Sequence, residues 1–148
     1  MEKLKFSTNI NAPKERVWEV LWNDAYYRMW TSVFSEGSYA ETDWNEDSKI
    51  LFLDGKGSGM VSFIAAKRPY EFMSFKHMGI VKDGVEQMDG EEVKAWQGSL
   101  ENYTLTETNG NTQLNVEMDS NKDYKDYFEK TWPKALEQVK ILAENNKE

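Results

Sequence analysis

The sequence contains a single histidine, and its position makes it the first candidate for chemistry. His77 alternates with Met73 and Phe75 in a stretch that predicts a half-buried strand, so its ring shares a face with apolar side chains. Because an imidazole changes charge near neutral pH, the ring can serve as a general base or as a hydrogen-bond donor to a ligand. The alternative is a structural histidine with its nitrogens hydrogen-bonded in the core or at its rim. We therefore treat His77 as a candidate ligand contact and assign no catalytic residue.

Two further polar residues stand two positions apart on another predicted strand. Glu101 and Tyr103 share one face of that strand and can form a polar patch that assists His77. A pair that faces solvent is the simpler expectation. No Ser-His-Asp or zinc motif stands out and the chain has no cysteine, so we expect neither a metal nor a cofactor. A binding protein is accordingly a better hypothesis than an enzyme.

The other groups that can carry chemistry fall in predicted turns. Residues 55–59, Gly-Lys-Gly-Ser-Gly, resemble a phosphate loop only superficially, because they lack the strand–loop–helix setting and the Gly-Lys-Ser/Thr ending. This segment predicts a hairpin turn instead. Seven acidic residues lie mostly in turns, at spacings that match no calcium-binding EF-hand loop, and we expect them to be solvated. They are Asp43, Asp47, Asp54, Asp83, Asp89, Glu91 and Glu92.

Aromatic residues are abundant, with six Trp, seven Tyr and seven Phe. Large rings fill protein cores, but Trp and Tyr also line ligand sites because each combines an apolar face with one polar group. Both interpretations stay open for each ring. The residues predicted to line a ligand cavity are Trp30, Phe63, Phe75, His77, Trp96, Tyr103, Phe128 and Trp132.

The elements that must position these residues follow from hydrophobic periodicity. Residues 3–11 alternate as a strand does, and Pro13, which suits the first position of a helix, begins a helix that ends near Trp22. Asn23 caps a second short helix through Trp30. Residues 84–94 are irregular and predict either a loop between two strands or a disordered segment. The strands predicted around that loop are 38–44, 49–53, 59–67, 71–81, 96–107 and 112–119.

A long amphipathic helix is predicted over residues 124–144. Its apolar side chains recur at steps of one, three or four residues, and Pro133 should bend it. Only this helix is long enough to cover the apolar face of the sheet. The sequence therefore predicts an α+β helix-grip fold, with about six or seven curved antiparallel strands around the C-terminal helix. A curved sheet and one helix leave space between them, so we also expect a cavity.

Composition limits the classes of partner. The formal net charge is -8, which disfavours both nucleic acid and anionic membranes as partners. No stretch approaches the ~20 apolar residues of a membrane span. The start of the sequence does not resemble a signal peptide, so we expect a cytoplasmic protein. Without repeats or linkers, residues 1–148 predict a single domain.

Three segments resemble the START-like (SRPBCC) superfamily. Residues 10–18, INAPKERVW, resemble its opening, in which a strand meets a helix through A-P-x-x-x-V-W. Residues 59–75 resemble its central hairpin, and residues 131–136 carry the W-x-x-x-L element of its last helix. Within the superfamily, the sequence most resembles the branch related to the C-terminal domain of the Hsp90 ATPase activator. The resemblance covers nearly the whole chain and implies the helix-grip fold.

The resemblance implies three kinds of function, because relatives bind lipids, hormones or polyketides, act on a chaperone, or catalyse cyclisation. The preferred hypothesis is a small hydrophobic or amphipathic ligand held between the sheet and the C-terminal helix. The second is a protein-interaction module that acts on a chaperone or another protein. The third is a cyclase- or hydrolase-type enzyme in which His77 is the base, assisted by Tyr103 or Glu101.

Overall fold

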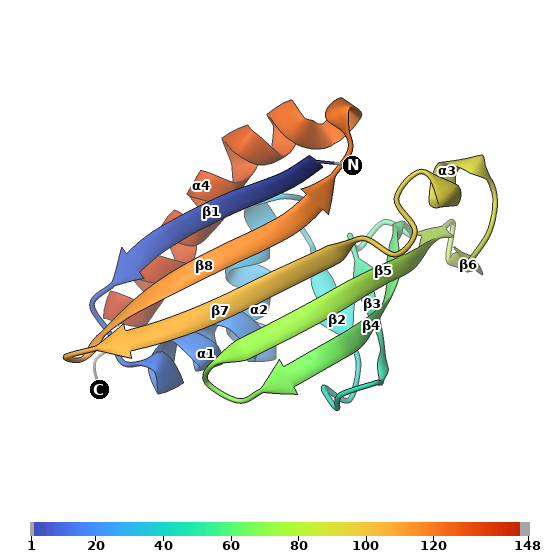
Figure 1. Cartoon of the computed structure of the whole chain (residues 1–148). Coiled ribbons are helices and arrows are strands. Elements are labelled where there is room, and N and C mark those ends of the chain that lie inside the picture. Colours follow the sequence, from blue (N-terminus) through green and yellow to red (C-terminus); the bar gives the residue numbers. More distant parts are fainter. Residues whose placement is uncertain (1, 146–148) are drawn as a thin grey trace.

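The computed structural model describes residues 2–145 as a layer of strands and a layer of helices (Figure 1). One strand comes first, two helices follow, and a long helix closes the chain. The strands are β1 (Glu2–Ile10), β2 (Tyr39–Glu41), β3 (Lys49–Leu53), β4 (Gly59–Arg68), β5 (Phe72–Lys82), β6 (Val85–Gln87), β7 (Leu100–Thr108) and β8 (Asn111–Ser120). The helices are α1 (Lys14–Trp22), α2 (Asp24–Trp30), α3 (Glu91–Lys94) and α4 (Lys122–Asn145), with a 3₁₀ turn at Thr31–Val33.

The strands form one antiparallel sheet in the order β1-β8-β7-β5-β4-β3-β2, and β6 pairs with the far end of β5. The predicted α+β helix-grip class is confirmed. The sheet has eight strands rather than six or seven, because the segment predicted as a loop over 84–94 contains both β6 and α3. β6 forms because the turn after β5 sends the chain straight back along that strand.

That turn and one other are two-residue hairpins with left-handed backbone. Asp83 and Gly84 have φ of 52° and 78° between paired Lys82 and Val85. Asn109 and Gly110 have φ of 55° and 81° between β7 and β8. Asn, Asp and Gly adopt this conformation at the least cost, and such turns match the twist of the strands they join. These local signals fix the register of both hairpins.

Helices α1, α2 and α4 cover one face of the sheet (Figure 1). Pro13 takes the cap position before α1 rather than the first helical position. The Asn23 side chain caps α2 by accepting a hydrogen bond from the Ala25 amide, as its residue type predicts. Pro133 lies within α4.

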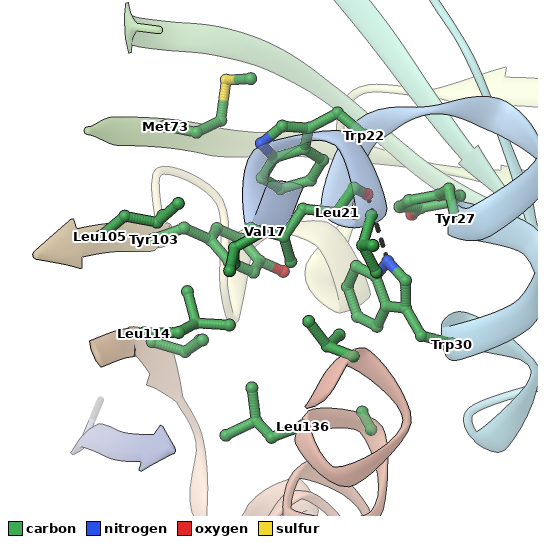
Figure 2. Packing of buried hydrophobic residues seen from close by; sticks show 14 of the residues in the cluster. Val17, Leu21, Trp22, Tyr27, Trp30, Met73, Tyr103, Leu105, Leu114 and Leu136 are labelled. Carbon is green, nitrogen blue, oxygen red and sulfur yellow. Dashed lines mark hydrogen bonds between the residues drawn. The ribbon is translucent and has the colours of Figure 1, made fainter. Parts of the chain in front are cut away.

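The core between the two layers is dominated by rings. Trp30, Tyr103 and Phe75 are among the largest side chains that are fully buried, and Trp22 and Trp132 pack with them. Figure 2 shows the part of this core around Trp22, Trp30 and Tyr103. It includes the hydrogen bond of 3.1 Å from Trp30 Nε1 to the carbonyl oxygen of Leu21.

Two predicted strands are longer than those observed. Of residues 38–44 only Tyr39–Glu41 pair, because the chain then turns, with Trp44 at φ 64°. Trp96 lies in the turn after α3, and β7 begins at Leu100. Among residues 2–145, no helix has the length and apolar character needed to cross a membrane.

Candidate functional site

Four polar side chains form a hydrogen-bonded chain on the inner face of the sheet. Ser62 Oγ lies 2.7 Å from His77 Nδ1, and His77 Nε2 lies 3.1 Å from Glu101 Oε1. Tyr103 donates its phenolic proton to the other carboxylate oxygen, Oε2. The side chains of Ser62, His77 and Tyr103 are buried, and that of Glu101 is 16% exposed. We call these four residues the polar chain.

The register of three strands brings the polar chain together. Ser62 on β4 stands opposite His77 on β5, next to an irregularity between Val61 and Ser62 that shifts the pairing. The backbone of His77 pairs with Ser99, the residue just before β7, since its N–H donates to Ser99 O at 2.9 Å. Glu101 follows two residues later on the same side.

The expectation of a solvent-facing Glu101–Tyr103 pair is wrong. The two residues do share a face and do interact, but that face is the covered one. In the pairing of β7 with β5, Glu101 stands opposite Phe75 and Tyr103 stands opposite Met73. Phe75 and Met73 are fully buried. Alternation showed that the two side chains point the same way, but it did not show which way.

Burial sets the protonation of the two phenols at the site. Burial raises the pKa of Tyr103 well above the ordinary value, and the charge of Glu101 and the hydrogen bond to it raise it further. Burial, with a contribution from the Glu101 charge, likewise raises the pKa of Tyr27, which is buried on α2. Both phenols therefore remain neutral hydrogen-bond donors at ordinary pH.

The polar chain contains the residue types of a nucleophilic triad, but not an accessible nucleophile. In such triads a serine gives its proton to a histidine that a carboxylate orients. Here the serine and the carboxylate bind opposite nitrogens of His77 in the same sense, yet Ser62 is 0% exposed. A substrate cannot reach Ser62 Oγ in this conformation. What the arrangement offers instead is an acceptor, Glu101, close to the surface.

The predicted site residues fall into two groups. Phe75, Tyr103, Trp30 and Trp132 lie together in the core, and the ring of Tyr103 is 6.0 Å from the rings of both Phe75 and Trp132. Trp96 is half-buried, with its ring 6.3 Å from His77. The structure brings these residues and His77 into one continuous cluster.

The other two predicted residues are peripheral. Phe128 on α4 is half-buried at the edge of the core. Phe63 is 36% exposed and lies between the buried residues Ser62 and Ile64, so alternation places it on the opposite face of the sheet. It does not join the cluster.

Side chains fill the space between α4 and the sheet where a cavity was expected. The Trp22 ring lies 4.8 Å from that of Tyr103 and 5.3 Å from that of Phe75. Two hollows, of about 370 and 450 Å³, lie elsewhere: one beside the β7–β8 turn, and one over the polar side chains of β1, β7 and β8. None of the eight predicted residues lines either hollow.

Two tryptophan N–H groups in this filled interior have no partner. Trp22 Nε1 and Trp132 Nε1 are buried and form no hydrogen bond in the described part of the chain. An unpaired buried donor is costly, so its presence calls for an explanation such as a bound molecule or water. The spacing of residues in sequence gives no sign of either group.

Sequence reasoning also missed Ser62 and Tyr27. Ser62 looks like an ordinary strand residue, and only its position opposite His77 gives it a role. Tyr27 approaches Glu101 from a helix far away in sequence. Within residues 2–145, no group of three or more His, Cys, Asp or Glu side chains is arranged to hold a metal ion.

Comparison with known proteins places the fold. No family model matches the sequence, and no curated protein matches it. Protein MLL2253 from Mesorhizobium loti has a TM-score of 0.76 at 16% identity, with 99% of this chain and 100% of that chain covered. The Aha1 dimer from Colwellia psychrerythraea has a TM-score of 0.74 at 16% identity, with 100% of both chains covered.

A third solved structure is DynU16, from the dynemicin biosynthetic locus. Its TM-score is 0.72 at 13% identity, with 98% of this chain matched to 48% of that chain. At such low identities these likenesses establish the helix-grip fold and nothing finer.

Proposed function

We propose that this protein binds a small hydrophobic or amphipathic molecule within the grip, beside the polar chain. The observation that carries the proposal is the run of hydrogen bonds from Ser62 through His77 to Glu101 and Tyr103, enclosed by aromatic rings. Ligand sites are mostly apolar, with a few convergent polar groups that orient the ligand. The inner face of the sheet has this composition.

Stability alone does not account for the polar chain. Buried polar groups that hydrogen-bond to one another contribute little net stability compared with apolar side chains of similar shape, because every partner loses hydration. The unpartnered Trp22 and Trp132 N–H groups add to that cost. Groups that weaken an apolar core but can bind a ligand are typical of a binding site.

Binding requires some of the interior rings to move. Trp30 and Tyr103 are fully buried, whereas Trp96 is half-buried and stands on the connection between α3 and β7. Trp96 is therefore the ring that can leave with the least disturbance of the core. In this proposal the observed state is the closed one, and the ligand shifts the population to an open one.

A thermal-shift screen tests the proposal, because a ligand that binds only the folded protein raises its stability. At 100 times its Kd, a ligand stabilises by about 2.7 kcal/mol, which raises Tm by roughly 5–11 °C for a chain of this size. The screen compares fatty acids, sterols, aromatic phenols and aromatic amines. Hits are repeated on Glu101→Gln and on Glu117→Gln, an exposed glutamate on β8. If no compound stabilises the protein, the proposal fails.

A second candidate function is protein interaction, favoured by an exposed aromatic group at the start of α4. Tyr124 is 55% exposed and Tyr127 is 42% exposed, and both rings lie against Phe128. Tyr127 also donates a hydrogen bond of 3.1 Å to the carbonyl oxygen of Phe34. Exposed tyrosines are common at the centre of protein interfaces.

The Aha1 name of one solved structure suggests the partner to try first, an Hsp90 chaperone. Tyr124→Ala with Tyr127→Ala should weaken capture of the chaperone and stimulation of its ATPase at least tenfold. Met29→Ala, an equally exposed apolar residue on α2, is the control. Absence of binding at tens of micromolar excludes this candidate.

A further inference from the structure

We infer that the ligand is an aromatic amine, with its ring in the place now held by the Trp96 indole and its ammonium group on Glu101. This inference rests on the proposed function and specifies its ligand. It is carried by the charge of the polar chain, by the absence of a buried cation among residues 2–145, and by the position of Trp96 beside His77.

The hydrogen bonds leave the polar chain with one negative charge. Ser62 forms one side-chain hydrogen bond, to His77 Nδ1, so its proton is satisfied when it donates to that nitrogen. His77 then carries its proton on Nε2 and donates it to Glu101, which also accepts from Tyr103. Every donor is satisfied with a neutral imidazole and an ionised carboxylate. The carboxylate retains unused lone pairs.

No cationic side chain neutralises this carboxylate. Within residues 2–145 every lysine and arginine is at least partly exposed, and none of them forms an ion pair with Glu101. A carboxylate with little access to water gains most from a charged donor that also brings its own hydrogen bonds. The net charge of -8 favours the approach of a cation over that of an anion.

Trp96 shows what fits next to the polar chain. Its indole lies edge-on to His77, with ring centroids 6.3 Å apart and planes at 75°. Phe52 meets His77 in a similar way at 6.0 Å. The space that the Trp96 indole would vacate is that of a flat bicyclic ring beside His77, the residue that binds Glu101. Aromatic faces also attract cations, which adds to the preference for an amine.

The segment that carries Trp96 lies between two glycines. It is held to β5 by the hydrogen bond of 2.7 Å from the Gly98 N–H to the carbonyl oxygen of His77, which opening must break. Gly90 and Gly98 flank it with φ of 110° and 90°, and neither has an atom near the place of a side chain. Most residues between them are exposed, and Val93 is the buried exception. Figure 1 shows α3 projecting at one end of the sheet, away from the main helices. Glycines in this conformation allow the backbone changes that a hinge needs.

Three probes that share the indole ring and differ in charge test the inference by isothermal titration calorimetry. They are tryptamine, 3-ethylindole and indole-3-propionate, which carry a positive charge, no charge and a negative charge. We expect the wild-type protein to bind tryptamine about tenfold or more tighter than 3-ethylindole, with the acid weakest. This comparison needs no variant and so does not depend on any variant folding.

Variants then locate the effect. Glu101→Gln should remove the preference for tryptamine, while Glu117→Gln should keep it. Trp96→Ala should tighten all three probes, because the native occupant of the site is gone. Circular dichroism confirms that each variant is folded.

The results separate this inference from the proposed function. If 3-ethylindole or the acid binds as tightly as tryptamine, or if Glu101→Gln keeps the preference, the amine assignment is overturned and ligand binding stands. If none of the probes binds either the wild type or Trp96→Ala, and the thermal-shift screen also finds no ligand, both fail.

Discussion

Removing one oxygen atom, by Tyr103→Phe, probes the polar chain most directly. The phenol is 2% exposed and donates to the carboxylate of Glu101. The ring itself stays, with its contacts to Trp22 at 4.8 Å and to Phe75 at 6.0 Å between centroids. The substitution therefore deletes a hydrogen bond and little else.

The magnitude follows from what Glu101 loses. A hydrogen bond to a charged group contributes about 1.5–3 kcal/mol, and its loss leaves the carboxylate short of a donor. The Glu101 side chain is 16% exposed, so water replaces part of the bond, and we expect about 1–2 kcal/mol of destabilisation. For a chain of this size that lowers Tm by roughly 2–8 °C.

Urea unfolding followed by circular dichroism measures the change. Tyr124→Phe, at an exposed tyrosine on α4, is the matched control and should stay within about 0.5 kcal/mol of the wild type. Combining Tyr103→Phe with Glu101→Gln completes a double-mutant cycle and should give a coupling energy of about 1 kcal/mol. A Tyr103→Phe protein as stable as the wild type, with no coupling, refutes a hydrogen-bonded chain in the core.

Three further predictions concern the core and the turns. Burial raises the pKa of Tyr27 and Tyr103, so the stabilisation that depends on their neutral form is complete below pH 10. Above pH 10, urea unfolding should show that the free energy of unfolding falls by up to about 1.4 kcal/mol per pH unit for each tyrosine. Gly59→Ala should destabilise the protein far more than Gly84→Ala in the same assay, because a methyl group at Gly59 overlaps a backbone carbonyl of β3. At Gly84 the methyl group meets no atom, and only the φ of 78° is unfavourable. Equal losses of stability would contradict this. Leu21→Ala, at a fully buried position of α1, should cost about 2–5 kcal/mol by calorimetry, and a cost below 1 would show a loosely packed core.

Local patterns were enough to predict most of the fold. Alternation along β1 and β8, the Asn109-Gly110 and Asp83-Gly84 turns, and the apolar stripe of α4 each depend on neighbours a few residues apart. Such signals survive in any tertiary context. β6 was not predicted, because three exposed residues become a strand only when β5 offers an edge to pair with.

The site was predictable only in part. His77 and Tyr103 were identified by residue type, but their connection through Glu101 depends on which face of β7 is covered. Ser62 joins them because pairing shifts between Val61 and Ser62, and alternation does not encode that shift. Aromatic rings pack in the interior where a cavity was expected. The space that a helix leaves on a curved sheet depends on how the ring volumes add, which a pattern of apolar positions cannot give.

The two outer strands of the sheet bear on how the protein behaves at high concentration. An unpaired strand edge can recruit a strand from another molecule and start aggregation. At one edge β2 has only three residues, too few for stable pairing. At the other, β1 carries the charged side chains of Lys3 and Lys5, and Lys140 donates to the free carbonyl oxygen of Asn9 at 2.9 Å. Each of these two edges thus has a feature that disfavours strand exchange, and we expect concentrated solutions to remain free of fibrils.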